Sequence, residues 1–462
     1  MLATVEVFPP STKLLLESGM PFLFQGGGHM ALSIGSIFAK FHALIHSLTP
    51  EDVAKNPSRD FSRTRKLSIE DLFMWLIRLG RDCLDTELRN LFKGRPGDAP
   101  TKSAVVQQRA KLSDNALPYV FNQFNNTFPV SQTVNGVHIF AGDGSDLNIP
   151  PDGDDASAFI PYNSNNGGYH QYHVNTIYGI SEHRFIDVVV QPRKTLNENA
   201  ALCEMVRRNP VEGECLYIMD RGYNSLHLMA TIRETGNYFL IRLKDPGKGS
   251  MVDCFKLPDG KEYDIPLEFY VSRSRKSADR DKAGFKKLMA HQKFDYLDPK
   301  NPADTYKIPF RLIKIHLKDG TYEYLITNLP KDRFPHHMMK YLYHLRWSQE
   351  TAYFLLKYKA DLSFLHSRKR KYVTQEIYAR LILYNLTLLL AGSVTVKKEG
   401  TKYEYKVNIT QAFVTCRFLL RGDLAPDDVY HELCRYVTPI RPDRHYERKM
   451  RSQRLPPLNN RN

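Results

Sequence analysis

The chain has 462 residues, and its 65 lysines and arginines against 50 aspartates and glutamates give a formal net charge of +15. This length exceeds that of one ordinary core, so we expect about three domains, or one core with large insertions. A basic excess indicates a polyanionic partner, nucleic acid before anionic membrane. The six cysteines show no C-x-x-C spacing, which argues against a zinc site or a disulfide framework and favours a reducing, cytoplasmic setting.

Neither a secretory signal nor a membrane span is expected. Pro9-Pro10 and Glu17 interrupt the first twenty residues, which lack the basic start and continuous apolar run of a signal. The longest apolar stretch, Leu381 to Val396, contains Asn385 and falls short of the ~20 residues that cross a bilayer. We therefore predict a buried helix there and no membrane partner.

The two ends of the chain carry little functional signal. Residues 1–66 are a poorly defined segment, with a glycine loop at 26–28 and one helix near 36–47. Residues 396–462 are predicted to form a C-terminal helical region that ends in an arginine-rich tail from 441 to 454.

Residues 67–130 have the pattern of several short helices. Ser68-x-x-Asp71 has the form of a capping box ahead of an apolar run, and helical patterns follow at 85–92 and 103–112. Short helices joined by turns are typical of a small DNA-binding bundle.

The last of these helices has a polar, basic character from Lys102, Arg109 and Lys111. Such a face suits contact with the DNA backbone, but a solvated helix surface has the same pattern. The pattern alone favours neither interpretation.

Residues 131–244 are predicted to form several strands, followed by alternating helices and strands. Strands alternating with helices indicate an α/β fold with a mixed sheet covered on both faces, with ligands at the carboxyl ends of its strands. The predicted strands are 137–141, 171–180, 185–191, 215–219 and 238–243, and the predicted helices are 196–208 and 226–234.

Residues 245–332 read as a β-rich insertion into this core. The segments 307–316 and 322–327 flank Asp319-Gly320 as a predicted hairpin. A basic run at 272–287 is usually a solvated loop, although it would also suit a DNA backbone. Helices resume at 333–395, where we expect the core to be completed.

Two aspartates are predicted to lie where strands end. Asp143 follows the strand at 137–141, and Asp220 follows the strand at 215–219. Aspartate at a strand end is ordinary turn chemistry, so these positions alone do not predict catalysis. Asp146 competes with Asp143 for the first position.

A third acidic position lies on a predicted helix in the segment 333–395. Tyr343, Arg346, Glu350 and Lys357 fall on one stripe about 60° wide when they are placed at helical spacing. The opposite face is apolar. The stripe fits either a solvated face with an Arg346–Glu350 pair or a functional site. The pattern supports the two interpretations about equally.

Three carboxylates beside two cations suit the displacement of a phosphodiester. Two Mg²⁺ ions held by carboxylate oxygens stabilise the attacking and leaving oxygens of such a reaction. Arginine and lysine beside the acids would hold backbone phosphates. By contrast, His170 and His173 lack further zinc ligands, and no G-x-S-x-G segment supports a serine hydrolase.

Three segments resemble the signature regions of insertion-sequence transposases that carry the Y-R-E-K motif. They are Asp143-Gly-Ser, Asp220-Arg-Gly-Tyr and Tyr343-x2-Arg346-x3-Glu350-x6-Lys357, and the resemblance covers roughly residues 67–390. It implies a ribonuclease H-like catalytic core in which Asp143, Asp220 and Glu350 are the catalytic and metal-binding residues. It also implies that Tyr343, Arg346 and Lys357 hold DNA.

The resemblance implies cut-and-paste transposition, with metal-dependent cleavage at element ends followed by strand transfer. The expected cofactor is two Mg²⁺ ions, for which Mn²⁺ can substitute. The expected partners are the terminal inverted repeats of the element and target DNA, bound by a homodimer on paired ends in a bacterial-type nucleoid. The alternatives are a metal-dependent endonuclease without strand transfer and a non-catalytic, transposase-derived DNA-binding protein.

Overall fold

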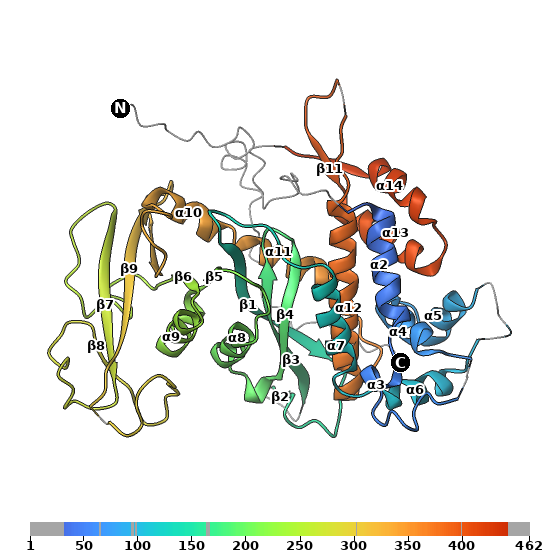
Figure 1. Ribbon diagram of the computed structural model, residues 1–462, viewed down its shortest axis with the longest axis horizontal. Coiled ribbons are helices and arrows are strands. Elements are labelled where there is room, and N and C mark those ends of the chain that lie inside the picture. Colours follow the sequence, from blue (N-terminus) through green and yellow to red (C-terminus); the bar gives the residue numbers. More distant parts are fainter. Residues whose placement is uncertain are drawn as a thin grey trace.

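The structure is a computed structural model that describes residues 32–63, 66–93, 97, 99–162, 167–301, 303–398 and 400–441. The predicted glycine loop at 26–28 and the arginine-rich tail beyond residue 441 lie outside these residues. Helices from both halves of the chain gather at one end of the molecule, and a long sheet continues from them to the other end (Figure 1). The expected α/β architecture, with a mixed sheet flanked by helices and an N-terminal helical region, is confirmed.

One mixed sheet contains ten of the strands in the described residues. Its order is β2-β3-β1-β5-β6-β10-β9-β7-β8, and β4 pairs with the free part of β3. The central pairs β1–β5 and β5–β6 are parallel. The strand bounds are β1 His138–Ile149, β2 Phe159–Pro161, β3 Gly168–Gly179, β4 Arg184–Pro192, β5 Cys215–Met219, β6 Tyr238–Arg242, β7 Tyr263–Ser272, β8 Phe285–Lys287, β9 Tyr306–His316 and β10 Tyr322–Thr327.

Helix α4 begins where its local capping signal predicts. Ser68 caps α4 through a capping box with Asp71, as its spacing predicts. A separate pair, β11 Tyr405–Val407 and β12 Val437–Pro439, lies among the C-terminal helices. The helix bounds are α2 Ile34–His46, α3 Pro50–Val53, α4 Ile69–Arg78, α5 Leu84–Leu91, α6 Lys102–Lys111, α7 Ala116–Thr127, α8 Glu198–Arg207, α9 Leu226–Glu234, α10 His336–His344, α11 Trp347–Tyr358, α12 Arg370–Gly392, α13 Ile409–Arg421 and α14 Pro426–Arg435, with short 3-10 helices η2 Arg193–Thr195 and η3 Arg221–Tyr223.

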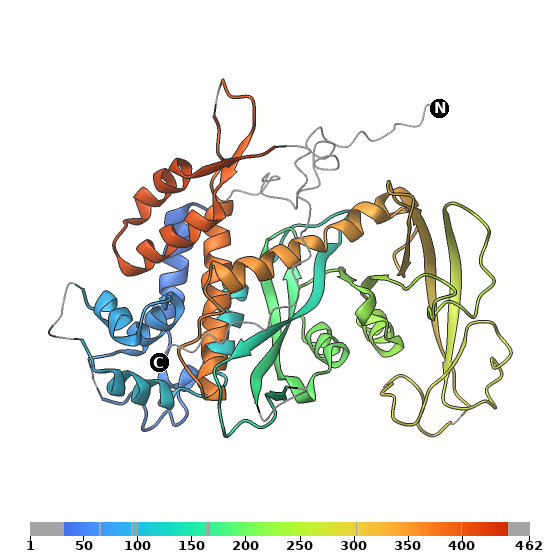
Figure 2. The ribbon, with the colours of Figure 1, turned by 180° about the vertical axis from the view of Figure 1, so that it is seen from behind.

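The central strands bury both of their faces. In β5, Leu216 and Ile218 belong to one hydrophobic core, while Tyr217 and Met219 belong to a second core. This alternation follows from the period of two along a strand. Helices α8 and α9 cover one face of the sheet in Figure 1, and α11 crosses the other face in the view from behind (Figure 2).

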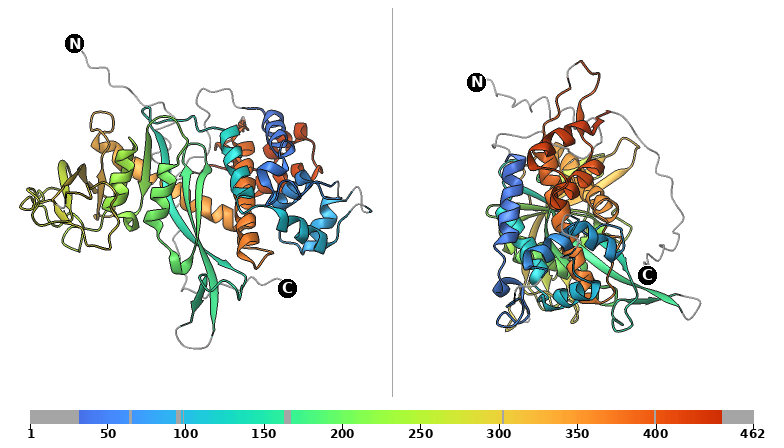
Figure 3. Two further views of the ribbon diagram at one scale, coloured as in Figure 1. Left: turned by 60° about the horizontal axis from the view of Figure 1, so that its bottom comes forward. Right: turned by 90° about the vertical axis from the view of Figure 1, so that its right-hand side faces the viewer.

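Helix α12 is the axis of the helical end of the molecule. Its apolar middle is buried, as the run from Leu381 predicts, and α4, α7 and α13 pack around it. In the described part of the chain, no helix is both long and apolar enough to cross a membrane. The long ladder of β1 and β3 extends away from these helices and beyond the rest of the sheet (Figure 3).

The strand-rich segment after β6 continues the same sheet. Its predicted hairpin of β9 and β10 is confirmed, with Tyr322 opposite His316. Strand β10 then pairs with β6, where Thr327 lies opposite Leu240. The backbone hydrogen bonds of β6 are therefore shared between the core and the hairpin that follows it.

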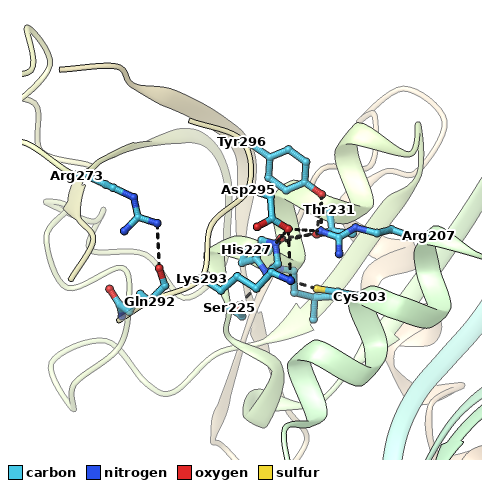
Figure 4. Close-up of polar contacts among 11 residues, drawn as sticks. Cys203, Arg207, Ser225, His227, Thr231, Arg273, Gln292, Lys293, Asp295 and Tyr296 are labelled. Atoms are coloured by element: carbon cyan, nitrogen blue, oxygen red, sulfur yellow. Dashed lines mark hydrogen bonds and ion pairs between the residues drawn. The ribbon is translucent and has the colours of Figure 1, made fainter. Parts of the chain in front are cut away.

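A polar cluster ties the loop before β9 to helices α8 and α9 (Figure 4). One carboxylate oxygen of Asp295 lies 2.9 Å from Nη2 of Arg207 and 3.1 Å from Nε2 of His227. The Tyr296 hydroxyl donates to Oγ1 of Thr231 over 2.9 Å. These contacts fix the outer part of the sheet against the helices that cover its centre.

Candidate active site

Asp143 lies within a long strand, so the expected turn after residue 141 is wrong. Strand β1 runs to Ile149, because residues 140–149 pair continuously with β3 and Asp143 lies opposite Thr176. The parallel pairing with β5 nevertheless stops at Gly142. Asp143 is therefore the first residue of β1 beyond the parallel ladder, where one edge of the strand becomes open.

Asp220 occupies the equivalent position on the neighbouring strand. Gly142 and Met219 are paired in the parallel ladder, and the next residues are Asp143 and Asp220. Adjacent parallel strands lie about 4.8 Å apart, so the two carboxylates leave the sheet side by side. Oδ1 of Asp220 accepts a hydrogen bond of 2.7 Å from the backbone N–H of Gly222 and thereby caps η3.

The helix that carries Glu350 begins later than its stripe predicts. The predicted single helix is interrupted, because α10 ends at His344 and α11 begins at Trp347. Between them Arg346 N–H bonds to the Tyr343 carbonyl, three residues back, in a tight turn. Tyr343 and Glu350 therefore lie on different helices.

Two polar side chains of α11 dock this helix onto the strands that carry Asp143. The Tyr353 hydroxyl lies 3.0 Å from the Asp143 carbonyl oxygen and 2.9 Å from the Val174 carbonyl oxygen. Nε2 of Gln349 donates to Oγ1 of Thr176 over 2.9 Å. Because both side chains are buried, these bonds fix Glu350 relative to Asp143. No sequence pattern pointed to them.

Arg346 lies between two of the three acids. Its Nη2 is 2.8 Å from Oε1 of Glu350, and its Nη1 is 3.8 Å from Oδ2 of Asp143. The guanidinium also lies 5.9 Å from the ring centre of Tyr343 and 5.5 Å from that of Trp347. Arg346 is thus a buried counter-ion that aromatic rings hold in place.

Asp143 lies close enough to the other two acids for their charges to affect its pKa. Burial raises the pKa of Asp143 to about 6, and the charges of Asp220 and Glu350 add to this rise. The hydrogen bond from Gly144 N–H and the charge of Arg346 oppose it. A buried carboxyl group whose pKa is raised by two other acids is a typical arrangement at functional sites.

The donor set fits a hard divalent cation. The oxygens of Asp143, Asp220 and Glu350 are the ligands that Mg²⁺ and Mn²⁺ prefer, and the mutual repulsion of these acids would be relieved by such an ion. Across the described residues, however, no three acidic, histidine or cysteine side chains already converge as metal ligands. Each acid instead accepts a hydrogen bond, from Gly144, Gly222 and Arg346 respectively. Binding an ion requires these carboxylates to exchange partners.

The competing acid, Asp146, belongs to a different cluster. Its Oδ1 lies 2.7 Å from Nδ1 of His173, whose Nε2 is 2.9 Å from Oε1 of Glu198. These carboxylates raise the pKa of His173, although burial of the ring opposes them. The Nζ of Lys357 donates to the Asp146 carbonyl over 2.6 Å. Because the Asp146 carboxylate is paired with His173 and not with Arg346, the geometry favours Asp143 as the first acid of the site.

Gly144 lets His173 pack against the strand beside Asp143. A Cβ on Gly144 would lie 2.0 Å from Nε2 of His173, so alanine requires the ring to move. We expect Gly144→Ala to lower the free energy of unfolding by about 1–3 kcal/mol in urea denaturation. Gly153→Ala is the control, because no atom lies within 4 Å of its added Cβ. Equal losses in the two variants, or no rescue of Gly144→Ala by His173→Ala, would contradict this packing.

Outside this site, Cys203, His227 and Asp295 are arranged in the order of the catalytic residues of a cysteine protease. Sγ of Cys203 lies 3.9 Å from Nδ1 of His227, whose Nε2 faces Asp295 (Figure 4). Burial raises the pKa of the Cys203 thiol, which disfavours the nucleophilic thiolate. The thiol is therefore a packed core residue, and the cluster joins structural elements.

The candidate DNA-binding residues outside the acids have different environments. Arg109 has 3% of its surface exposed and pairs with Glu376, so its predicted place on a DNA-facing surface is wrong. Tyr343 is also buried, with 4% exposed, and does not reach the surface to hold DNA. Lys102 is exposed and pairs with Asp85 over 2.6 Å, and Lys111 lies over the ring of Phe61. On α6, Lys102 and Lys111 therefore remain candidates for contact with DNA.

The chain matches the family model of the transposase DDE domain over residues 138–386, more than half of its length. The chain belongs to the DDE transposase family. The matched part begins with β1 and ends within α12, so it contains Asp143, Asp220 and Glu350. The transposase family expected from the three signature segments is therefore confirmed at the level of the DDE domain.

One solved structure similar to this transposase is the cryo-EM structure of a piggyBac transposase synaptic complex with hairpin DNA. The two chains share 11% sequence identity with a TM-score of 0.44, and the similarity covers 87% of this chain and 83% of that chain. No curated protein matches the sequence of this transposase.

Proposed function

We propose that this transposase cuts DNA at the ends of a mobile element and joins the freed ends to target DNA. The observation that carries the proposal is that Asp143 and Glu350 flank one buried guanidinium, while Asp220 lies beside Asp143 on the neighbouring strand. Asp143 and Asp220 extend from the adjacent parallel strands β1 and β5. Glu350 comes from helix α11, which is docked on β1. Membership of the DDE transposase family supports the same chemistry.

In the proposed reaction, water attacks a backbone phosphorus and the bond to the 3′-oxygen breaks, which leaves a 3′-hydroxyl and a 5′-phosphate. The same hydroxyl then attacks a phosphorus of the target strand and displaces its 3′-oxygen. Divalent ions, when bound, stabilise the charge on the attacking and leaving oxygens. Asp143, Asp220 and Glu350 would hold two such ions, with Mg²⁺ as the proposed cofactor and Mn²⁺ as a substitute.

We assign different tasks to the two cations of the signature motif. Arg346 touches Glu350 and Asp143, so it orients the acids and balances their charge. Lys357 is half-buried, and its ammonium donates to the Asp146 carbonyl, a contact that it would exchange for a phosphate oxygen when DNA binds. Tyr343 packs on the Arg346 guanidinium and acts through it.

The proposed partners are the terminal repeats of the element and a target duplex. The net charge of +15 favours a polyanion, and Lys102 and Lys111 are proposed to contribute backbone contacts. Since two element ends must be held together for joining, we propose a homodimer on paired ends. These assignments rest on the proposed function.

Joining is the step that separates a transposase from a nuclease. With Mg²⁺ and an end that carries a 3′-hydroxyl, the protein is expected to join that end covalently to plasmid DNA. The matched control is the same end with a 3′-dideoxy terminus, which cannot attack. Plasmid nicking without any joined product would favour a metal-dependent endonuclease, and neither nicking nor joining with retained binding would favour a DNA-binding protein.

Metal affinity should depend on pH through Asp143. Because burial raises the pKa of Asp143 to about 6, a proton competes with the metal below this value. We expect Mn²⁺, titrated by calorimetry, to bind tightly at pH 7.5 and progressively more weakly below pH 6. In Asp143→Asn, the remaining pH dependence of Mn²⁺ affinity should shift toward the pH range in which ordinary carboxyl groups titrate. An affinity that does not change between pH 5 and pH 7.5 would contradict the assignment.

A further inference from the structure

One arginine in the core of the helical end has a charge that its surroundings do not balance. Arg380 of α12 has 0% of its surface exposed. None of its three guanidinium nitrogens has a hydrogen-bond partner among the described residues. Burial, together with the charge of the nearby Arg417, lowers the pKa of Arg380 to about 10. A buried cation without partners is among the most destabilising features that a core can contain.

The nearest carboxylates are already engaged by other groups. Glu376, one turn before Arg380 on α12, pairs with Arg109 over 3.1 Å and accepts from Ser367. Glu87 of α5 accepts the backbone N–H groups of Gly80 and Asp82 through the same oxygen, Oε1. Both acids attract Arg380 over a distance, but neither bonds to it.

A second guanidinium, that of Arg417 on helix α13, lies near enough to Arg380 for its charge to affect the pKa of Arg380. Arg417 donates from Nη2 to Asp361 over 2.9 Å and from Nη1 to the Lys359 carbonyl over 3.3 Å. Its Nε is buried and has no partner in the described part of the chain. Asp361 is shared, because Arg81 also pairs with it over 2.5 Å. Both oxygens of the Asp361 carboxylate are therefore already paired with arginines other than Arg380.

Cations exceed carboxylates in this interior. Arg78, Arg380 and Arg417 lie near Glu87 and Asp361, while Glu376 and Arg109 balance one another. Water would satisfy the free N–H groups but would not balance the charge. An anion does both, since charge-assisted hydrogen bonds to guanidinium are the stronger kind.

We propose that a small inorganic anion of the chloride type binds between the guanidinium groups of Arg380 and Arg417. The ligand is small because α12 and α13 pack closely here and bury Arg380 completely. The site joins α12 and α13 to Asp361, which follows α11, and through Arg81 to the N-terminal helices. The anion is a structural ligand of the helical end and does not depend on the proposed DNA chemistry.

Thermal unfolding in matched salts tests this site. At equal ionic strength, chloride is expected to raise the unfolding midpoint by about 2–4 °C over gluconate, which is too large to enter. The difference should disappear in Arg380→Met. It should persist in Arg311→Met, which removes a buried arginine that is fully paired with Asp264 and two carbonyls. Equal midpoints of the wild-type protein in chloride and gluconate would overturn the proposal.

A crystallographic measurement on the wild-type protein does not depend on the folding of any variant. Crystals soaked in bromide should show an anomalous peak within about 3.5 Å of guanidinium nitrogens of both Arg380 and Arg417. Sulfate soaks test for a larger oxyanion, and sulfate density there without bromide would exclude a chloride-type site. Ordered water, or a carboxylate from outside the described residues, in place of bromide would also overturn the proposal.

Discussion

Asp143→Asn, Asp220→Asn and Glu350→Gln are each expected to lower metal-dependent cleavage of end DNA by about 10³-fold or more. Each change removes the charge of one carboxylate while it keeps the shape of the side chain. The loss should appear in single-turnover cleavage with pre-bound DNA, since binding to the backbone depends on cations elsewhere. Gel-shift affinity for the same DNA should change little.

The matched control for the first acid is Asp146→Asn. Asp146 pairs with His173 and is not a neighbour of Arg346, so this variant should keep cleavage within about tenfold of the wild type. Folding is a second check. The raised pKa of Asp143 means that its ionised form is less stable in the folded than in the unfolded chain. At pH 7.5, where Asp143 is ionised, Asp143→Asn should therefore unfold at the same or a higher temperature than the wild type. Loss of cleavage in Asp146→Asn with activity retained in Asp143→Asn would reverse the assignment.

Local signals in the sequence predicted the individual elements well. Strand β5 and helix α9 have the predicted bounds. An apolar run defines the strand, and a capping residue defines the start of the helix. The capping box at Ser68 is present for the same reason. Asp220 follows its strand as predicted, because the apolar run before it ends there. These inferences need only neighbours in the chain.

The errors arose where distant segments decide the structure. Strand β1 continues through Asp143 because β3 supplies a partner for every residue from 140 to 149. Arg109 looked solvent-facing on its own helix, yet Glu376 lies 267 positions later and buries it. Tyr353 docks α11 on the Asp143 carbonyl, which no spacing within α11 reveals. The periodicity of apolar residues and the capping residues of a helix do not reveal contacts between segments that are distant in the sequence.

Replacing Arg346 should harm chemistry more than binding. The guanidinium contacts Glu350 and Asp143 and is buried, so Arg346→Ala leaves the acids without their counter-ion. We expect cleavage to fall by about 10²-fold, a typical loss when an oriented charge is removed from an active site. The pKa of Asp143 should rise further, because Arg346 lowers it in the wild type. The pH below which Mn²⁺ binding weakens should therefore move upward.

The comparison with Lys357→Ala separates orientation of the acids from contact with phosphate. Loss of a phosphate contact weakens binding, and low salt restores part of the affinity because fewer counterions compete. We expect low salt to restore much of the activity of Lys357→Ala and almost none of that of Arg346→Ala. Arg346→Lys should recover part of the pH shift, since it returns a charge without the planar fork. Full rescue of Arg346→Ala at low salt, with an unchanged pH profile, would show that Arg346 holds phosphate and does not orient the acids.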